Sequence, residues 1–122
     1  MIIEIDFNSQ EAIYVQLKNQ IVVAIAQDKL KKGDSLPSVR QMAEILGVNM
    51  HTVNKAYSIL RQEGYLTLDR RRGAVVEVLE DKDAELLSIC SDMEMLVARA
   101  ICKGVSKEDM LCLVDRVYNN YK

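Results

Sequence analysis

The chain has 122 residues, 49% of them hydrophobic and 28% charged, which is the composition of one folded domain with a small appendage rather than of a disordered segment. One proline, five glycines and no tryptophan disfavour a turn-rich β-sandwich, and the net charge of −2 gives no general attraction for polyanions. The longest uncharged apolar stretch, Ile21–Ala26, is far too short to cross a bilayer, and the first residues lack the basic region and long apolar run of a signal peptide. We therefore expect a cytoplasmic protein with no membrane partner.

The first predicted elements are a short strand and a helix. Residues 2–7 alternate loosely between apolar and polar side chains, as a strand does, and Asn8 or Ser9 can cap the helix that follows. Across residues 12–26 the apolar side chains recur every three or four positions, which predicts an amphipathic helix packed on a core. Residues 31–35 then predict a turn.

Two short helices are expected after this turn. The first of them covers residues 39–46, with Ser35 or Ser38 as its N-cap, and Gly47 ends it as a C-cap. The next covers residues 51–63 and has its own apolar stripe at helical spacing. Two short helices joined by a glycine-containing turn of three or four residues form a helix-turn-helix.

The spacing of apolar residues then changes from the helical repeat of three to four positions to the alternation of a strand. Gly64 ends the third helix, residues 65–68 and 74–79 predict two strands, and residues 69–73 form the tip between them. A strand pair directly after a helix-turn-helix is a wing. The expected fold class is therefore α+β and mainly helical, with a winged helix-turn-helix DNA-binding domain over residues 1–79.

Residues 80–122 predict a separate helical unit. The acidic run of residues 80–83 marks its start, apolar stripes lie on both sides of Gly104, and Ser106–Asp109 resembles a capping signal. Two helices of this length cannot enclose a core alone. We therefore expect a two-helix dimerisation unit whose apolar faces meet a second copy of the chain.

The cysteines and the single histidine predict no metal site. Cys90, Cys102 and Cys112 lack the paired spacing of zinc ligands, and His51 lies far from them in the sequence. Buried free thiols are the expected state, because free cysteine behaves as a small hydrophobe, and a redox switch is the alternative. The chain has no glycine-rich phosphate loop and no nucleophile constellation, so neither an enzyme nor a cofactor is expected.

Charge is distributed unevenly along the chain. Residues 29–72 hold nine basic and four acidic side chains, as suits a protein with one face turned to phosphate. The start of the third helix is polar, and residues at the start of a recognition helix read base edges in the major groove. These residues are Asn49, His51, Thr52 and Asn54, with Lys55 as a charge and Met50 as a possible contact to a thymine methyl.

Four ordered segments carry a family resemblance: Leu30–Arg40, Leu46–Asn49, Thr52–Tyr57 and Glu63–Leu66. They resemble the DNA-binding domain of the GntR family of transcription regulators. The lead-in Ile5–Ser9 and the very short C-terminal unit most resemble the YtrA subfamily. One departure is Arg71, which stands where the wing of the family commonly has its first glycine.

The resemblance implies DNA contacts outside the third helix as well. It makes Arg40 a base or phosphate contact and Tyr57 a phosphate donor. It also assigns wing contacts to the hairpin tip, namely to Arg70, Arg71, Arg72 and Gly73. Ser38, at the start of the second helix, completes the candidate DNA-binding residues.

Several of these residues also have a purely structural interpretation. Asn49 can cap the third helix, and His51 can be a solvated residue at the start of that helix. Tyr57 can pack in the core instead of donating to a phosphate. A run of arginines at a hairpin tip is ordinarily a solvated turn.

The function expected from the sequence is sequence-specific DNA binding by a homodimeric transcription regulator. It would act as a repressor on an inverted-repeat operator, and the resemblance suggests a transporter operon as its target. The expected partners are double-stranded DNA and a second copy of the chain, and an unidentified small-molecule effector is left open. The alternative is a winged-helix module that binds a protein and has lost DNA binding.

Overall fold

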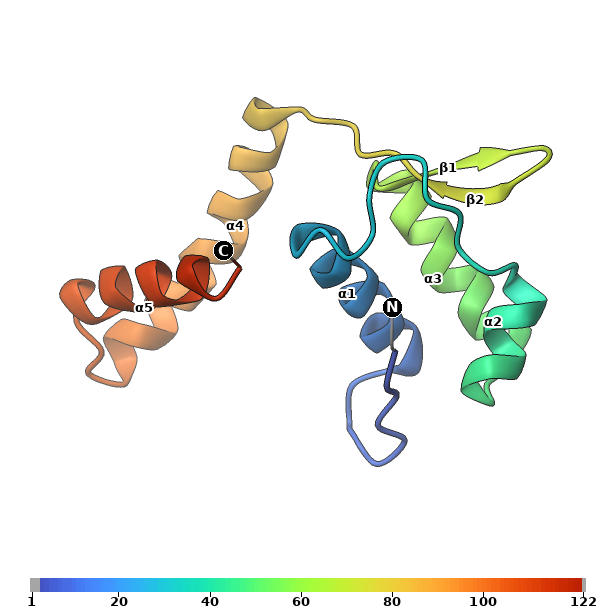
Figure 1. Ribbon diagram of the computed structural model, residues 1–122. Helices are drawn as coiled ribbons and strands as arrows, with labels where there is room; N and C mark the ends of the chain where they lie inside the picture. The colour runs from blue at the N-terminus through green and yellow to red at the C-terminus, as the bar shows by residue number, and fades with distance from the viewer. Residues whose placement is uncertain (1–2, 122) are drawn as a thin grey trace. The chain divides into compact units, whose positions relative to one another are not determined.

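The computed structural model describes residues 3–121 and divides into two compact units, residues 1–79 and residues 80–122. The first unit contains α1 (Ile13–Ala26), α2 (Val39–Leu46), α3 (Met50–Gln62), β1 (Leu66–Asp69) and β2 (Gly73–Val76), and the second contains α4 (Lys82–Cys102) and α5 (Lys107–Asn119), as Figure 1 shows. The expected fold class, a mainly helical winged helix followed by two helices, is confirmed. Within the described part of the chain, no helix has both the length and the apolar character that a membrane span requires.

The segment before α1 is not the strand predicted over residues 2–7, the first of which lies outside the described residues. The side-chain amide of Gln16 accepts the N–H of Asp6 at 2.9 Å and donates to the carbonyl of the same residue at 3.0 Å. One helical turn further on, Gln20 makes the same pair of hydrogen bonds with Glu4. Glutamine amides on α1 thus take the place of a neighbouring strand, so the alternating pattern occurs without a sheet.

The predicted N-cap of α1 is also wrong. The helix begins after Ala12, whose side chain makes no capping hydrogen bond. The hydroxyl of Ser9 instead accepts the N–H of Glu11 at 3.0 Å, inside the preceding loop. The Ser9 hydroxyl is therefore engaged in a local turn before the helix starts and does not cap α1.

Helices α2 and α3 form the predicted helix-turn-helix. Ser38 Oγ accepts the N–H of Gln41 at 3.1 Å, and the Gln41 side chain accepts the N–H of Ser38 at 3.1 Å, which makes a capping box. Gly47 takes a left-handed φ of 69° and ends α2, as expected. The chain then enters α3 through its N-cap, Asn49, and the helix begins at Met50, one residue earlier than predicted.

The wing, residues 66–76, is an antiparallel hairpin in which Leu66 pairs with Val76. Its second strand ends at Val76, whereas the sequence predicted a strand that continues to Leu79. The N–H of Leu79 still donates to the carbonyl of Gly64 at 2.7 Å. These last residues therefore remain attached to the winged helix, although they are not part of the ladder.

The segment before α2, predicted only as a turn over residues 31–35, pairs with β2 of this hairpin through backbone hydrogen bonds. The N–H of Gly33 donates to the carbonyl of Val76 at 2.8 Å, and the N–H of Leu36 donates to the carbonyl of Ala74 at 2.8 Å. The approach to α2 and the wing thus share a set of backbone hydrogen bonds.

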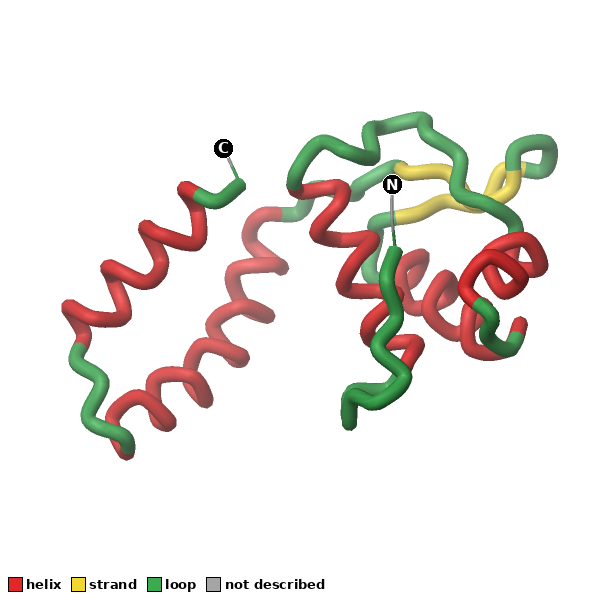
Figure 2. Tube along the Cα trace, turned by 60° about the horizontal axis from the view of Figure 1, so that its bottom comes forward, coloured by secondary structure: helices red, strands yellow, loops and turns green. Residues whose placement is uncertain are grey.

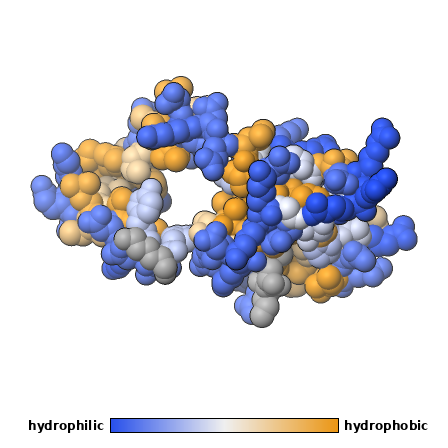
Figure 3. Space-filling view, turned by 45° about the horizontal axis from the view of Figure 1, so that its top comes forward, coloured by the Kyte–Doolittle hydropathy of each residue, from blue (hydrophilic) through white to orange (hydrophobic). Residues whose placement is uncertain are grey.

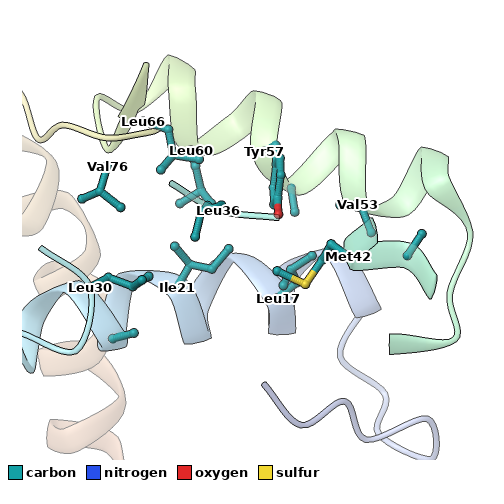
Figure 4. Close-up of a cluster of buried hydrophobic side chains, with 13 residues drawn as sticks. Leu17, Ile21, Leu30, Leu36, Met42, Val53, Tyr57, Leu60, Leu66 and Val76 are labelled. Atoms are coloured by element: carbon teal, nitrogen blue, oxygen red, sulfur yellow. The ribbon is translucent and has the colours of Figure 1, made fainter. Parts of the chain in front are cut away.

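One hydrophobic core joins α1, α2, α3 and the wing. Figure 4 shows Leu17 and Ile21 of α1 pointing toward the side chains of α3, of which Val53 and Leu60 are completely buried. The core cluster consists of Leu17, Ile21, Ala24, Leu30, Leu36, Met42, Ala43, Val53, Ala56, Tyr57, Leu60, Leu66 and Val76. All of these residues belong to the first unit, which therefore has a core of its own.

The second unit is a helical hairpin in which α5 folds back beside α4 (Figure 2). Asp81 caps α4 by accepting the N–H of Ala84 at 3.1 Å, and Ser106 with Asp109 forms the expected capping box at α5. Among the described residues of this unit, Ala100 alone is buried. The caps fix both helices locally, but the single chain leaves their apolar faces open to solvent, seen as orange surface in Figure 3.

The cysteines are exposed, which overturns the prediction of buried thiols. Cys90, Cys102 and Cys112 all lie on α4 or α5 and are free. Their helices bury only one described side chain, so these small apolar residues have no core to pack into within the single chain.

Candidate nucleic-acid interface

The first turn of α3 presents polar groups to solvent. Asn49 Oδ1 accepts the N–H of His51 at 2.7 Å, so Asn49 is the N-cap. Met50 and His51 are exposed and Thr52 is half-buried. Capping uses only the carbonyl oxygen of the Asn49 side chain, so its NH₂ group remains a donor for a base or a phosphate.

The next turn of α3 carries Asn54 and Lys55, both exposed. Within the described part of the chain, the Asn54 side chain makes no hydrogen bond. The Lys55 ammonium lies 4.0 Å from the centre of the Tyr14 ring, a cation–π contact that holds it beside α1. Asn54 is therefore free to read a base, whereas Lys55 presents its charge from a position set by an aromatic residue that the sequence analysis did not identify.

Helix α2 supplies two more candidate residues. Arg40 is exposed in the first turn of α2. The capping box occupies the Ser38 hydroxyl as an acceptor but leaves its proton for an external acceptor. In Figures 1 and 2, α2 and the tip of the wing lie on the same side of the first unit, so a single surface contains both.

Tyr57 lies in the core. Its hydroxyl donates to the carbonyl of Pro37 at 2.8 Å, and burial raises the pKa of Tyr57 above its ordinary value. The hydroxyl proton is therefore used inside the winged helix, next to the start of α2. The phosphate contact of Tyr57 stays a prediction. The alternative, packing in the core, agrees with the buried ring and with the hydrogen bond to Pro37.

Replacing Tyr57 with phenylalanine separates these two roles. We expect Tyr57→Phe to lower the free energy of unfolding by about 1 kcal/mol, because the Pro37 carbonyl loses its donor. Affinity for DNA should stay unchanged. Urea unfolding and a DNA titration of the same sample check this, and a loss of DNA affinity at unchanged stability would support the phosphate contact instead.

The three arginines at the wing tip are not equivalent. Asp69 Oδ1 accepts the N–H groups of Arg71 at 2.8 Å and Arg72 at 3.1 Å, which closes the tip as an Asx-type turn. The Arg72 guanidinium turns back and donates to the carbonyl of Gly33. Arg70 and Arg71 are exposed, and their side chains have no partner among the described residues.

We expect the wing tip to loosen in acid. The backbone N–H groups of Arg71 and, second, Arg72 hold the pKa of Asp69 below its ordinary value. Because the folded pKa is depressed, the stabilisation is complete above the ordinary pKa and is lost as the pH falls through the lowered value. The protection factors of the Arg71 and Arg72 amides, which are the intrinsic exchange rates at each pH divided by the observed rates, should therefore fall on acidification, while those of amides in α1 stay high. Asp69→Ala should show low protection factors for these two amides at every pH, and protection factors that change with pH in that variant would contradict the assignment.

The structure brings most of the predicted residues to the surface of the first unit. Those exposed are Ser38, Arg40, Asn49, Met50, His51, Asn54, Lys55, Arg70, Arg71 and Arg72. Gly73 opens β2 with a left-handed φ of 75°, and Thr52 is half-buried. Over residues 3–121, no three His, Cys, Asp or Glu side chains come together as a metal site. This arrangement can donate hydrogen bonds and positive charge, the chemistry that DNA recognition uses.

Residues 10–76 match the sequence-family model of the bacterial regulatory proteins, gntR family. The chain belongs to the GntR family. It is 32% identical to the HTH-type transcriptional repressor YtrA of Bacillus subtilis, in a match that covers 88% of this chain and 85% of that protein. These findings confirm the resemblance predicted from the sequence.

Two solved structures extend the comparison of this GntR-family chain. YtrA from Sulfolobus acidocaldarius, a GntR-family transcription factor, is 43% identical with a TM-score of 0.64, over 78% of this chain and 99% of that one. The DNA-binding domain of AraR in complex with operator ORX1 is 26% identical with a TM-score of 0.54, over 63% of this chain and 99% of that one. The chain is thus a DNA-binding transcription regulator of the GntR family, similar to the YtrA subfamily, and its relatives are regulators rather than enzymes.

Proposed function

We propose that this GntR-family regulator is a homodimeric repressor that binds an inverted-repeat operator. The observation that carries the proposal is the open apolar surface of α4 and α5, next in sequence to a winged helix that has its own core. The repressor role is supported by the similarity to YtrA of Bacillus subtilis, which is named a transcriptional repressor. In a prokaryotic cell such a protein acts in the cytoplasm, where the DNA lies.

The dimer interface is assigned to residues 80–122. Leu87 is 76% exposed and Ile101 is 72% exposed, and one protomer offers no other element of its hairpin to cover them. The large apolar side chains exposed on this unit are Leu86, Leu87, Ile89, Met95, Leu96, Val97, Ile101, Val105, Leu111, Leu113, Val114, Val117, Tyr118 and Tyr121. An apolar surface of this extent marks an interface, and a self-complementary interface between two copies has two-fold symmetry.

Each winged helix of the dimer would read one half-site. Helix α3 enters the major groove with Asn49, His51 and Asn54 toward the base edges. Arg40, Arg70 and Arg71 reach the backbone or the flanking minor groove and supply affinity that does not depend on sequence. The symmetry of the dimer then requires two half-sites that are inverted and a whole number of helical turns apart.

The identity of the regulated genes and the binding of an effector are also parts of this proposal. A transporter operon as the target rests only on the family resemblance, and a small-molecule effector has no assigned site. The alternative, a winged helix that binds only proteins, receives no support from the exposed and unpaired Asn54, Arg70 and Arg71.

Selection of bound fragments from the source genome, followed by footprinting, tests the proposal. We expect an inverted repeat that is protected symmetrically and a fall of transcription in vitro when the protein is added to that template. A template with one half-site scrambled is the matched control and should lose most of the repression. Protection of a single asymmetric site, or increased transcription, would contradict the dimeric repressor.

A further inference from the structure

A groove of about 150 Å³ lies between α3 and the wing. Its α3 wall carries Asn54, Ser58 and Arg61, which share one face of the helix because they are four and three positions apart. The other wall is formed by β1, at residues 66–68. The base of the groove is apolar and includes the buried ring of Tyr57.

The groove holds unused hydrogen-bond donors and a positive charge. Arg61 is exposed and Ser58 is half-buried, and neither side chain has a partner among the described residues. Thr67 on the opposite wall donates its hydroxyl to Glu77 at 3.2 Å, so that group is already engaged. A guanidinium and a free hydroxyl that line one groove with apolar side chains suit a phosphodiester, which accepts hydrogen bonds and carries one negative charge.

We infer that this groove seats one backbone phosphate of the DNA, with Arg61 and Ser58 as its donors. The inference rests on the proposed DNA-binding mode, in which the start of α3 and the wing tip touch one duplex. A backbone strand that passes from one of these elements to the other lies over the space between them. A phosphate fixed there sets how deeply α3 enters the major groove, because backbone contacts position the protein and base contacts specify the sequence.

A purely structural role for Arg61 needs its own control. Arg61 lies in the last turn of α3, where a cation interacts favourably with the helix dipole. Arg116 lies in the last turn of α5, a helix of the same 13-residue length outside the winged helix. Arg116→Gln therefore removes the same charge from an equivalent helix end and matches Arg61→Gln.

The test uses the full chain and a labelled random-sequence duplex titrated at several salt concentrations. Arg61→Gln should weaken binding roughly tenfold and reduce the slope of log affinity against log salt by about one, the loss of one neutralised phosphate. Arg61→Lys should restore the salt slope, since it keeps the charge. Ser58→Ala should weaken binding without changing the slope, and Arg116→Gln, in the unit assigned to the dimer interface, should leave the salt slope unchanged.

Three further results would overturn the inference. An Arg61→Gln variant with the salt slope of the original protein would show that Arg61 meets no phosphate. Equal losses for Arg61→Gln and Arg116→Gln, accompanied by equal drops in melting temperature, would reduce Arg61 to a helix-end charge. An unsubstituted protein that binds no duplex at any salt concentration would refute the proposed DNA-binding mode itself, and the groove assignment with it.

Discussion

Removing residues 80–122 is expected to leave a monomer that binds its operator about 10²- to 10⁴-fold more weakly, because the two winged helices are no longer joined and each binds its half-site alone. The truncated chain should still fold. Its core residues all lie before the cut, and ending the chain after Leu79 keeps the hydrogen bond from Leu79 to Gly64. Sedimentation and operator titration of the truncated and full chains measure both effects.

A double substitution in the full chain distinguishes loss of the dimer from a general effect of shortening the chain. Ile89→Glu combined with Ile101→Glu places charges in the apolar groove on α4, where both side chains are exposed in the protomer. These changes should dissociate the dimer and reproduce most of the loss of operator affinity. Ser91→Glu, an exposed position of the same helix outside this groove, should leave the dimer intact. A truncated chain that still sediments as a dimer would contradict the assignment of the interface.

The second large effect is expected at Asn54. Its replacement by alanine should weaken operator binding by roughly 1–3 kcal/mol, the usual cost of a lost base contact, and leave random DNA almost unaffected. The side chain is exposed and makes no hydrogen bond within the described residues, so the substitution should not lower the free energy of unfolding. Isotherms on operator and random DNA, with a urea titration of each variant, provide the measurement.

The wing supplies the contrasting variant. Arg70→Ala combined with Arg71→Ala should weaken operator and random DNA to similar degrees and reduce the salt slope by about one to two. Arg72 is left in place because its guanidinium already donates to the carbonyl of Gly33. If Asn54→Ala weakened both DNAs equally, α3 would not read a base at that position.

The fold was predictable wherever local patterns determine it. The stripes of α1 to α3, the N-cap expected at Ser35 or Ser38 and the C-cap at Gly47 depend on residues close together in the sequence. The failures involve partners that are distant in the sequence. The alternation of residues 2–7 predicted a strand because a single sequence does not show that Gln16 and Gln20 supply its hydrogen bonds.

The candidate site shows the same division. The exposed residues of α3 and the wing could be listed from their helical positions and their chemistry. Three contacts could not be predicted from the sequence, because each joins separate elements of the tertiary structure. They are the hydrogen bond from Tyr57 to Pro37, the packing of Lys55 on Tyr14 and the hydrogen bond from Arg72 to Gly33. The exposure of the cysteines was mispredicted for a related reason, since apolar residues on a helix need not be buried within one protomer.

The backbone hydrogen bonds from Gly33 and Leu36 to β2 tie the approach to α2 directly to the wing. A movement of the wing relative to α2 would break this ladder and disturb the core residue Leu36 at the same time. The wing and the start of α2, which we propose contact DNA, are therefore coupled and should move together. In the dimer that we propose, a signal that changes operator affinity would then act by altering the spacing between the two winged helices, while the shape of each stays constant.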